Sequence, residues 1–327
     1  MASFLKVTLF GSSNSKATAF TPATDIPSLA GRTILITGGA GDLGRAAAIS
    51  LAAHGLPAHI IIADLPRDSA AQETALSAIR SALPAAAQES VKLSFLDLDL
   101  GSLDAVADAA RRFREVAPEG RLDLLVLNAG IMPVKAGTTR DGYEVAFGVN
   151  YLGHALLARL LLPMMVETQK VQGDVRVVVV ASEGHSMAPK GGVVFEKVKG
   201  DCKDMTYFRR YGQSKVALIG LAKTLAAEYP QLKIAAVHPG RIATGLGKTL
   251  AQDSKLIRYT GFLAKYMTTT LDLGVLNHLW AAVSPDVQSG FYYIPVGILD
   301  KKTIIEKDTT LAGRLKEWTD NELKGRY

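Results

Sequence analysis

The sequence predicts an α/β protein built on a Rossmann-type, doubly wound parallel sheet. Apolar runs of strand length alternate with helical stretches along the whole chain, which is the order that a parallel sheet requires. Three of these runs, residues 34–36, 60–63 and 175–180, are almost continuously apolar, as strands covered by helices on both faces should be. We therefore expect a three-layer sandwich with the sheet in the middle.

The chain is expected to form a single domain, residues 31–327, after an N-terminal extension, residues 1–30. No linker, charge block or internal repeat marks a further boundary. The first 25 residues are rich in Ser and Thr and carry no acid before Asp25, as in a transit peptide, but they also lack arginine. The alternative is an extension that packs on the fold and ends at residues 25–27, where Pro27 fixes the approach to the first strand.

Residues 32–44 predict a strand, a glycine turn and the start of a helix. Gly38, Gly41 and Gly44 allow a tight turn, close approach of backbone N–H groups to a pyrophosphate, and close packing of the helix on the strand. A second predicted strand, residues 59–63, ends at Asp64, about 20 residues beyond the last glycine, where a carboxylate can accept hydrogen bonds from the ribose of an adenine dinucleotide. With strand, helix and acid in register, the pattern favours a dinucleotide site over an ordinary glycine-rich turn.

Tyr211 and Lys215 lie four residues apart at the start of a predicted helix, so their side chains share one face. A nearby cation favours the ionised form of an acid. We therefore expect Lys215 to lower the pKa of Tyr211 below its usual value of about 10, which would make the phenol a proton donor and acceptor. Such pairs occur by chance in many helices, so this interpretation depends on the dinucleotide motif upstream.

Together these motifs resemble the short-chain dehydrogenase/reductase family, from about residue 26 to the C-terminus. The predicted strand 122–127 is followed by Asn128, Ala129 and Gly130, which resemble the family's Asn-Ala-Gly motif beside the cofactor. Asn150 matches the family's active-site asparagine, and Ser182, directly after a predicted strand, matches its catalytic serine. The resemblance makes residues 31–327 the catalytic domain and implies four catalytic residues, Asn150, Ser182, Tyr211 and Lys215.

Two further segments are similar to cofactor-binding parts of the family. Asp99 and Leu100 resemble the adenine-contacting segment, with Asp97 as a competitor for the role of the acid. Residues 238–240, followed by Thr244, resemble the segment around the nicotinamide. The residues expected to contact the cofactor are Thr37, Gly38, Gly41, Asp42, Leu43, Gly44, Asp64, Asp99, Leu100, Asn128, Ala129, Gly130, Tyr211, Lys215, Pro239, Gly240, Ile242 and Thr244. No metal-ligand set is predicted.

The glycine motif departs from the family's classical branch. Its sixth position is Asp42 and its fifth is Gly41, a spacing that matches the extended branch, which includes sugar-nucleotide epimerases. The segment between Ser182 and Tyr211 instead resembles the retinol dehydrogenase and related fungal branches. We expect Asp42 to face solvent and to favour the dipole at the helix N-terminus.

The resemblance implies an NAD(P)-dependent oxidoreductase that transfers a hydride between the nicotinamide and a carbonyl or secondary alcohol. Tyr211 would exchange the proton, Ser182 would bind the developing alkoxide, Lys215 would hold the nicotinamide ribose, and Asn150 would hold a water that links Lys215 to solvent. The alternatives are a sugar-nucleotide epimerase or dehydratase with tightly bound NAD and a non-catalytic dinucleotide-binding regulator. Candidate wall residues for an apolar substrate are Met187, Phe195, Met205, Tyr207, Phe208, Phe262 and Tyr266.

We expect NAD to be preferred over NADP, because the carboxylate of Asp64 accepts hydrogen bonds from ribose hydroxyls but repels a 2′-phosphate. Arg45 and Arg67 could each reach a phosphate, so NADP remains possible. Leu65 occupies the position where NADP-using relatives with an acid at this point often place a base.

Charge and cysteine content indicate little about macromolecular partners. The chain has 37 Lys and Arg against 31 Asp and Glu, a net charge of +6, and its basic clusters are short and mixed with acids, so no nucleic-acid partner is expected. No membrane span is expected, because Arg159 interrupts the longest apolar candidate, residues 155–166. Cys202 is the only cysteine, which favours a reducing, cytoplasmic location. We expect a homodimer or homotetramer that pairs the helix near residues 143–166 with the helix that begins at Tyr211.

Overall fold

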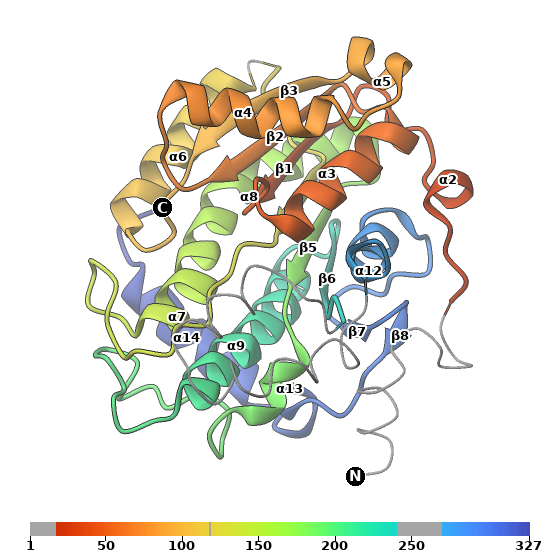
Figure 1. The fold of residues 1–327 in the computed structure, drawn as a ribbon. Coiled ribbons are helices and arrows are strands. Elements are labelled where there is room, and N and C mark those ends of the chain that lie inside the picture. The colour runs from red at the N-terminus through yellow and green to blue at the C-terminus, as the bar shows by residue number, and fades with distance from the viewer. Residues whose placement is uncertain (1–17, 118, 241–269) are drawn as a thin grey trace.

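The fold is taken from a computed structural model that describes residues 18–117, 119–240 and 270–327 (Figure 1). These residues form an eight-stranded sheet with the strand order β3-β2-β1-β4-β5-β6-β7-β8. Neighbouring strands are parallel except for β8, which is antiparallel to β7. The strands are β1 (Thr33–Thr37), β2 (His59–Asp64), β3 (Lys92–Asp97), β4 (Leu124–Leu127), β5 (Arg176–Val180), β6 (Lys233–Val237), β7 (Tyr292–Ile294) and β8 (Ile298–Leu299).

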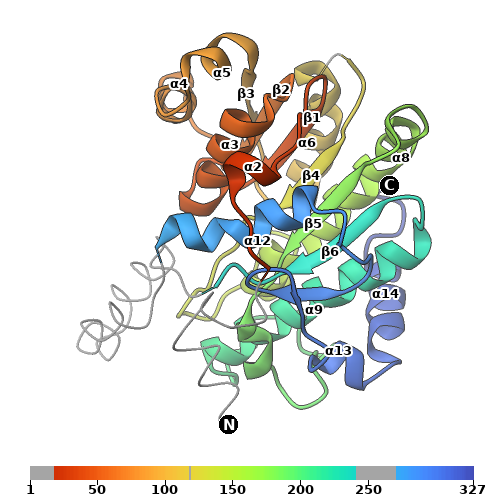
Figure 2. The same ribbon diagram turned by 90° about the vertical axis from the view of Figure 1, so that its right-hand side faces the viewer.

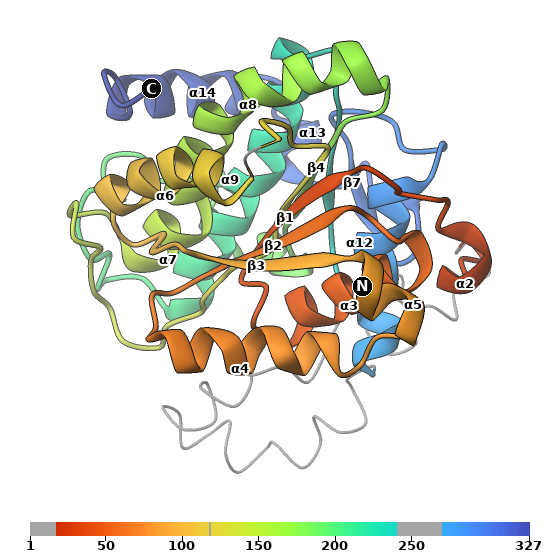
Figure 3. The same cartoon turned by 90° about the horizontal axis from the view of Figure 1, so that it is seen from above.

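Helices cover both faces of the sheet, so the predicted three-layer, doubly wound architecture is confirmed (Figures 2 and 3). On one face lie α3 (Asp42–Gly55), α4 (Ser69–Arg80) and α12 (Leu271–Val283), with α2 (Pro22–Asp25) and α5 (Ala85–Ser90) at its margin. On the other lie α6 (Leu103–Val116), α7 (Val145–Phe147), the π-helical turn η2 (Gly148–Leu152), α8 (Gly153–Gln172), α9 (Tyr207–Glu228), α13 (Ile304–Lys307) and α14 (Leu311–Glu322). A short 3₁₀ helix, η3 (Glu183–Met187), follows β5.

Alternation along each strand divides the core between the two layers. Leu35 and Ile61 belong to the cluster beneath α6, α8 and α9, whereas Ile34, Ile36 and Ile60 belong to the cluster beneath α3 and α12. Successive side chains of a strand point to opposite faces, so an apolar run fills both clusters at once. Because β1 to β7 run parallel to one another, their carboxyl ends all lie at one edge of the sheet.

The long apolar helix of this fold lies in the core. Against the expectation from sequence, one stretch among the described residues, 145–172, is long and apolar enough by composition to cross a membrane, but 83% of its most apolar window is buried inside the protein. Arg159, which we expected to interrupt the stretch, is itself buried and forms ion pairs with Glu228, at 3.8 Å, and with Asp320. Pairing compensates the charge, so the helix tolerates it.

The described part of the N-terminal extension packs on the fold. Thr18 donates its backbone N–H to the carbonyl of Val296 at 2.9 Å, and Leu29 donates to the carbonyl of Gly55 at 2.6 Å. Ile26 is buried in the cluster that also contains Leu51 of α3. These contacts agree with the alternative in which the extension packs against the fold.

The two helices that we expected to pair subunits, near residues 143–166 and from Tyr211, have most of their apolar side chains buried within the chain. Leu156 and Leu161 of α8 and Leu218 and Leu225 of α9 all lie in the core, and α14 packs along α9. The physical reason is that these side chains already cover the sheet and α14 covers part of α9. Association into oligomers stays a prediction, but these buried side chains of α8 and α9 no longer support it.

Candidate active site

A cavity of about 1030 Å³ lies at the carboxyl ends of β1, β2, β4, β5 and β6. Ligand sites of open α/β sheets form at this edge, where the strand order reverses. The structure brings most of the predicted residues to the walls of this cavity, namely Gly38, Gly41, Asp42, Leu43, Gly44, Asp64, Asp99, Leu100, Asn128, Ala129, Gly130, Ser182, Tyr211, Lys215, Pro239 and Gly240. Ile242 and Thr244 lie outside the described residues, as do Phe262 and Tyr266.

The glycine turn adopts a conformation that side chains would block. Gly38 has φ +63°, and a Cβ built on Gly44 would lie 2.4 Å from the carbonyl oxygen of Gly38. Helix α3 begins immediately afterwards at Asp42, whose side chain is 41% exposed and lies 3.8 Å from Arg45. Residues 41–44 at this helix start line the cavity, and the N-terminus of a helix can bind a pyrophosphate.

The end of β2 holds Asp64 firmly in place. Its Oδ2 accepts the N–H of Ala40 at 3.0 Å, and its Oδ1 accepts the N–H of Leu65 at 2.8 Å and pairs with Arg67 at 2.9 Å. The guanidinium of Arg67 also lies 5.3 Å from the ring centre of Phe95. The negative charge that the sequence places beside the ribose is therefore partly neutralised.

Asp99, and not Asp97, lies in the cavity wall. The carboxylate of Asp97 instead accepts a hydrogen bond from Gln72 at 2.9 Å and forms an ion pair with Arg112 at 3.6 Å. Asp99 Oδ1 accepts the N–H of Gly101 at 2.9 Å. Of the two acids that the sequence left open, Asp99 is thus the one that borders the cavity, and its contact with the adenine end stays a prediction.

Thr37 and Asn150 lie behind the wall of the cavity, fully buried. Thr37 Oγ1 accepts the N–H groups of Asn128 at 2.9 Å and of Ala129 at 3.0 Å, which joins the ends of β1 and β4. The Asn150 side chain exchanges two hydrogen bonds with the backbone of Ile131, at 2.7 and 2.9 Å. Both predicted residues therefore shape the wall from behind.

Ser182, Tyr211 and Lys215 meet at the end of β5. The Ser182 hydroxyl accepts the N–H of Gly184 at 3.1 Å and forms a hydrogen bond with the Tyr211 phenol. Lys215 Nζ donates to the carbonyl of Val180 at 3.1 Å and lies 5.4 Å from the ring centre of Tyr211. The phenol, the hydroxyl and the ammonium group thus border one space.

The expected direction of the Tyr211 pKa shift is wrong for the protein without cofactor. Burial raises the pKa of Tyr211 to about 12, against a smaller lowering by the hydrogen bond from Ser182. Burial also lowers the pKa of Lys215 to about 7, so this side chain is only partly charged at neutral pH. Helical spacing predicted that the two groups are neighbours, but desolvation decides their charges.

The apolar wall differs in part from the expectation. Met187 and Phe208 line the cavity, at 37% and 41% exposure. Tyr207 instead stacks on Phe208, with ring centres 4.1 Å apart. Phe195 packs near Trp318, with ring centres 6.0 Å apart, and Met205 is buried, so neither lines the cavity.

Several wall residues were not anticipated from the sequence. Glu183 and Gly184 follow Ser182 directly, and their position after a strand-ending serine was the available signal. His238, by contrast, begins the segment 238–240 that the sequence related to the nicotinamide; it lines the wall, and its Nδ1 accepts the N–H of Glu183 at 3.4 Å. Met132 extends the Asn-Ala-Gly segment, but no pattern distinguishes it from an ordinary core residue.

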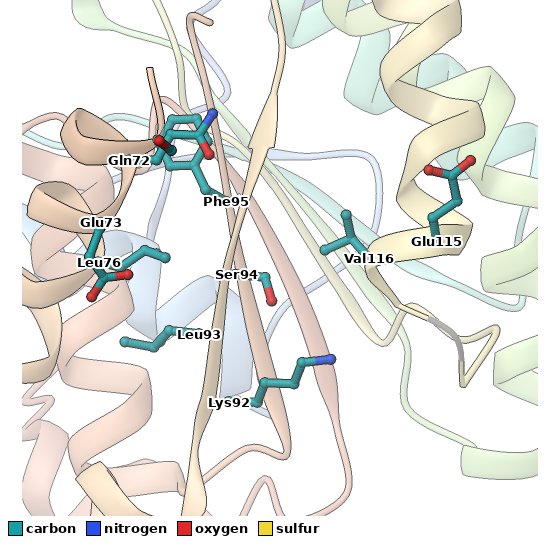
Figure 4. Close-up of a pocket in the computed structure, with 10 residues that line it drawn as sticks. Gln72, Glu73, Leu76, Lys92, Leu93, Ser94, Phe95, Glu115 and Val116 are labelled. Carbon is teal, nitrogen blue, oxygen red and sulfur yellow. The ribbon is translucent and has the colours of Figure 1, made fainter. Parts of the chain in front are cut away.

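A second cavity, of about 460 Å³, lies along the outer strand β3, between α4 and α6 (Figure 4). Gln72 and Glu73 come from α4, and Glu115 from α6. It contains none of the predicted site residues and lies at the edge of the sheet. The candidate active site is therefore the cavity at the strand ends.

Comparison with known proteins agrees with the fold and this site. A sequence model described as short chain dehydrogenase matches residues 32–255. The chain is 35% identical over 320 residues to a short-chain dehydrogenase/reductase of Aspergillus calidoustus, covering 92% of this chain and 96% of that one. It is 31% identical over 271 residues to human polyprenol dehydrogenase, covering 80% and 76%. A solved structure from Mycobacterium paratuberculosis, described as a putative uncharacterized protein, superimposes with a TM-score of 0.69 at 27% identity, covering 93% and 97%.

The fold, the glycine turn and the cavity define a Rossmann-type dinucleotide-dependent protein, and the chain belongs to the short-chain dehydrogenase/reductase family. It is an NAD(P)-dependent oxidoreductase. Neither the epimerase nor the regulator alternative is favoured.

Proposed function

We propose that the protein interconverts an apolar carbonyl compound and its alcohol, with Tyr211 as the proton donor and acceptor. The observation that carries the proposal is the meeting of Tyr211, Ser182 and Lys215 at one cavity that Met187 and Phe208 also line. When bound, the dinucleotide supplies the hydride donor or acceptor. The remaining steps belong to side chains of this chain.

The residues present fit a dinucleotide. The glycine turn leaves room for a pyrophosphate at the start of α3, and Asp64 lies at the end of β2. Among the described residues, Asn128 Oδ1 is buried without a hydrogen-bond partner, although Asn128 lines the cavity. A bound group with a donor would satisfy that oxygen.

The charges of Lys215 and Tyr211 depend on what lies beside them. Burial lowers the pKa of Lys215 to about 7, and Lys215 would favour its charged form, with a higher pKa, if an anionic dinucleotide were bound beside it. A charged Lys215 then stabilises the ionised phenol of Tyr211 and offsets the effect of burial on that pKa. With the cofactor bound, Tyr211 would thereby be ready for proton exchange. The spacing of Tyr211 and Lys215 alone did not indicate that the effect depends on the cofactor.

Ser182 is placed to bind the oxygen of the reacting carbonyl. Its hydroxyl faces Tyr211, so one substrate oxygen would contact both groups. A hydrogen bond from Ser182 stabilises negative charge that develops on this oxygen. Asn150 would act from behind the wall, through its hydrogen bonds to Ile131 and to Ser214.

The substrate is proposed to be apolar. Met132, Met187 and Phe208 line the cavity, and Met187 and Phe208 are exposed at 37% and 41%. The similarity to a protein named polyprenol dehydrogenase supports the same class of substrate. The preferred cofactor is proposed to be NAD, because the two backbone N–H groups that bind Asp64 hold its carboxylate at the ribose position.

The experiment is a turnover assay of the purified protein with NADH and NADPH. The panel contains apolar aromatic, polycyclic and isoprenoid ketones and aldehydes, with small polar sugars as the contrast, and the absorbance of the reduced nicotinamide is followed. Reduction of apolar carbonyls alone supports the proposal. Turnover confined to polar sugars would contradict it.

A cytoplasmic location and an oligomeric state are further proposals. The single cysteine supports a reducing compartment. Fluorescence microscopy of the tagged full-length chain tests the first, and sedimentation at micromolar concentration tests the second.

A further inference from the structure

His154 connects the floor of the cofactor site to the catalytic asparagine. It lies fully buried in α8, one turn after Asn150. Its Nε2 lies 2.9 Å from Thr37 Oγ1, and its Nδ1 lies 2.8 Å from the carbonyl oxygen of Asn150. One ring thus joins the end of β1 to the π-helical turn that carries Asn150.

These partners determine where the hydrogen of the imidazole lies. A carbonyl oxygen only accepts, so His154 Nδ1 must donate to Asn150. Thr37 Oγ1 already accepts two backbone N–H groups, from Asn128 and Ala129, so its own hydrogen is available for His154 Nε2. Nε2, at 2.9 Å, is a closer acceptor for it than a backbone carbonyl at 3.4 Å. Burial lowers the pKa of His154 to about 4, which keeps the ring neutral at physiological pH.

The hydrogen-bond chain continues from Asn150 into α9. Asn150 Nδ2 donates to Ser214 Oγ at 3.0 Å, and Ser214 Oγ donates to the carbonyl of Tyr211 at 2.7 Å. Every bond from Thr37 to Tyr211 therefore runs in the same donor-to-acceptor direction. A shift of Asn150 would act on the helical turn that bears both Tyr211 and Lys215.

Asn150 also lies close to the ammonium group of Lys215. A Cβ built on Gly130 would lie 3.4 Å from Asn150 Oδ1 and 3.5 Å from Lys215 Nζ, so both side chains border the same point. The dipole of the Asn150 amide therefore affects the stability of the charged Lys215. This effect depends on where Asn150 is held, and His154 is the side chain that ties its backbone carbonyl to β1.

We propose that His154 is a positioning residue whose neutral, Nδ1-protonated ring fixes Asn150 relative to Thr37 and, through Asn150, sets the environment of Lys215. The inference rests on the proposed function, because it takes Lys215 as the group that contacts the nicotinamide ribose. It adds a residue that none of the sequence motifs indicated.

The tautomer is tested on the full chain by NMR with ¹⁵N-labelled histidine, which distinguishes protonated from unprotonated ring nitrogens. The expected result is a His154 ring protonated at Nδ1 and unprotonated at Nε2 from pH 5.5 to pH 8. A ring protonated at Nε2, or one that gains a second proton near neutral pH, would overturn the inference. This measurement needs neither substrate nor cofactor.

The coupling to Lys215 is tested with three variants and NADH as the probe. His154→Asn can place an amide N–H near the Nδ1 position, His154→Gln can place its amide oxygen near the Nε2 position but leaves the Nδ1 position without a donor, and His154→Leu keeps neither. NADH affinity is measured by fluorescence from pH 6 to pH 9, so that the midpoint of its pH dependence reports on Lys215. His154→Asn should keep the native midpoint, whereas His154→Gln and His154→Leu should shift it and weaken binding by about tenfold, the effect of one lost hydrogen bond of about 1.4 kcal/mol.

His59 provides the matched control. It is also buried and bonded through both nitrogens, to Glu119 at 3.1 Å and to Ser94 at 2.8 Å, but it lies at the other end of β2. His59→Gln should lower the melting temperature without moving the NADH midpoint. If folded His154→Gln and His154→Leu also keep the native midpoint, or if His154→Asn is impaired as strongly as they are, the inference is wrong. A native protein whose NADH affinity does not depend on Lys215 would contradict the proposed function instead, and the NMR result would still decide the tautomer.

Discussion

Replacing Gly184 with alanine should displace the catalytic phenol. A Cβ built on Gly184 would lie 2.6 Å from Cε1 and 3.0 Å from Cδ1 of Tyr211, and 3.3 Å from Ser182 Oγ. Non-bonded carbon atoms pack at about 3.5–4.0 Å, so either the ring or η3 has to move by about 1 Å. Tyr211 is only 8% exposed and borders the cavity, so a displaced ring would shift within the site itself.

The size of the effect follows from that distance. A misplacement of about 1 Å at a reacting group costs about 100-fold in rate, which corresponds to about 2.7 kcal/mol in the barrier. We expect the kcat of Gly184→Ala to fall by about this factor. NADH affinity should change by less than about threefold, because the glycine turn and Asp64 lie at the other end of the cavity.

The assay measures kcat with a carbonyl compound from the panel, NADH affinity by fluorescence, and thermal unfolding of each variant. Gly313→Ala is the control, because a Cβ built on Gly313 in α14 has no other atom within 4 Å. The control should keep native kcat and gain slightly in stability, since alanine is the better helix former. A folded Gly184→Ala variant with kcat within about threefold of the native value would refute the reasoning.

Three further predictions concern charge. Burial lowers the pKa of His154 and of His278 to about 4 each, below the ordinary 6.5, so the unfolded chain binds more protons. The free energy of unfolding that these two histidines contribute is therefore fully present above pH 6.5 and is lost as the pH falls toward 4, by about 2 kcal/mol per histidine at pH 5. Urea unfolding measures this loss, and a protein that is equally stable at pH 5 and pH 7.5 would exclude it. Burial places the pKa of Lys215 at about 7 in the free protein, so NADH affinity should fall as the pH rises above 7, by at most about tenfold per unit, and Lys215→Met should show no such slope. Asp64→Ala should raise the ratio of catalytic efficiency with NADPH to that with NADH by at least about tenfold, and Arg67→Leu should lower this ratio. A native preference for NADPH that Asp64→Ala leaves unchanged would show that the arginines decide the choice of cofactor.

Much of the site could be predicted because its residues occupy fixed places relative to strands and helices. Gly38 directly follows β1, Gly44 lies in the first turn of α3, and Ser182 lies just after β5, so the topology alone brings them to one edge of the sheet. Tyr211 and Lys215 share a helical face for the same kind of reason. Local sequence carries this information.

The remainder depends on tertiary packing. His154 lies 117 residues from Thr37 along the chain, and no local pattern indicates their contact. The direction of the Tyr211 pKa shift follows from burial, which a spacing of four residues does not reveal. In the same way, Phe195 and Phe208 look alike in sequence, but one packs near Trp318 and the other lines the cavity.

The central claim is that Tyr211 exchanges the proton with the substrate. Tyr211→Phe removes only the phenolic oxygen and keeps the buried ring, so it tests this claim most directly. The measurement pairs steady-state turnover of an apolar carbonyl compound with NADH affinity in the same preparation. The account predicts that turnover is lost while NADH affinity stays near the native value, and near-native turnover by Tyr211→Phe would contradict it.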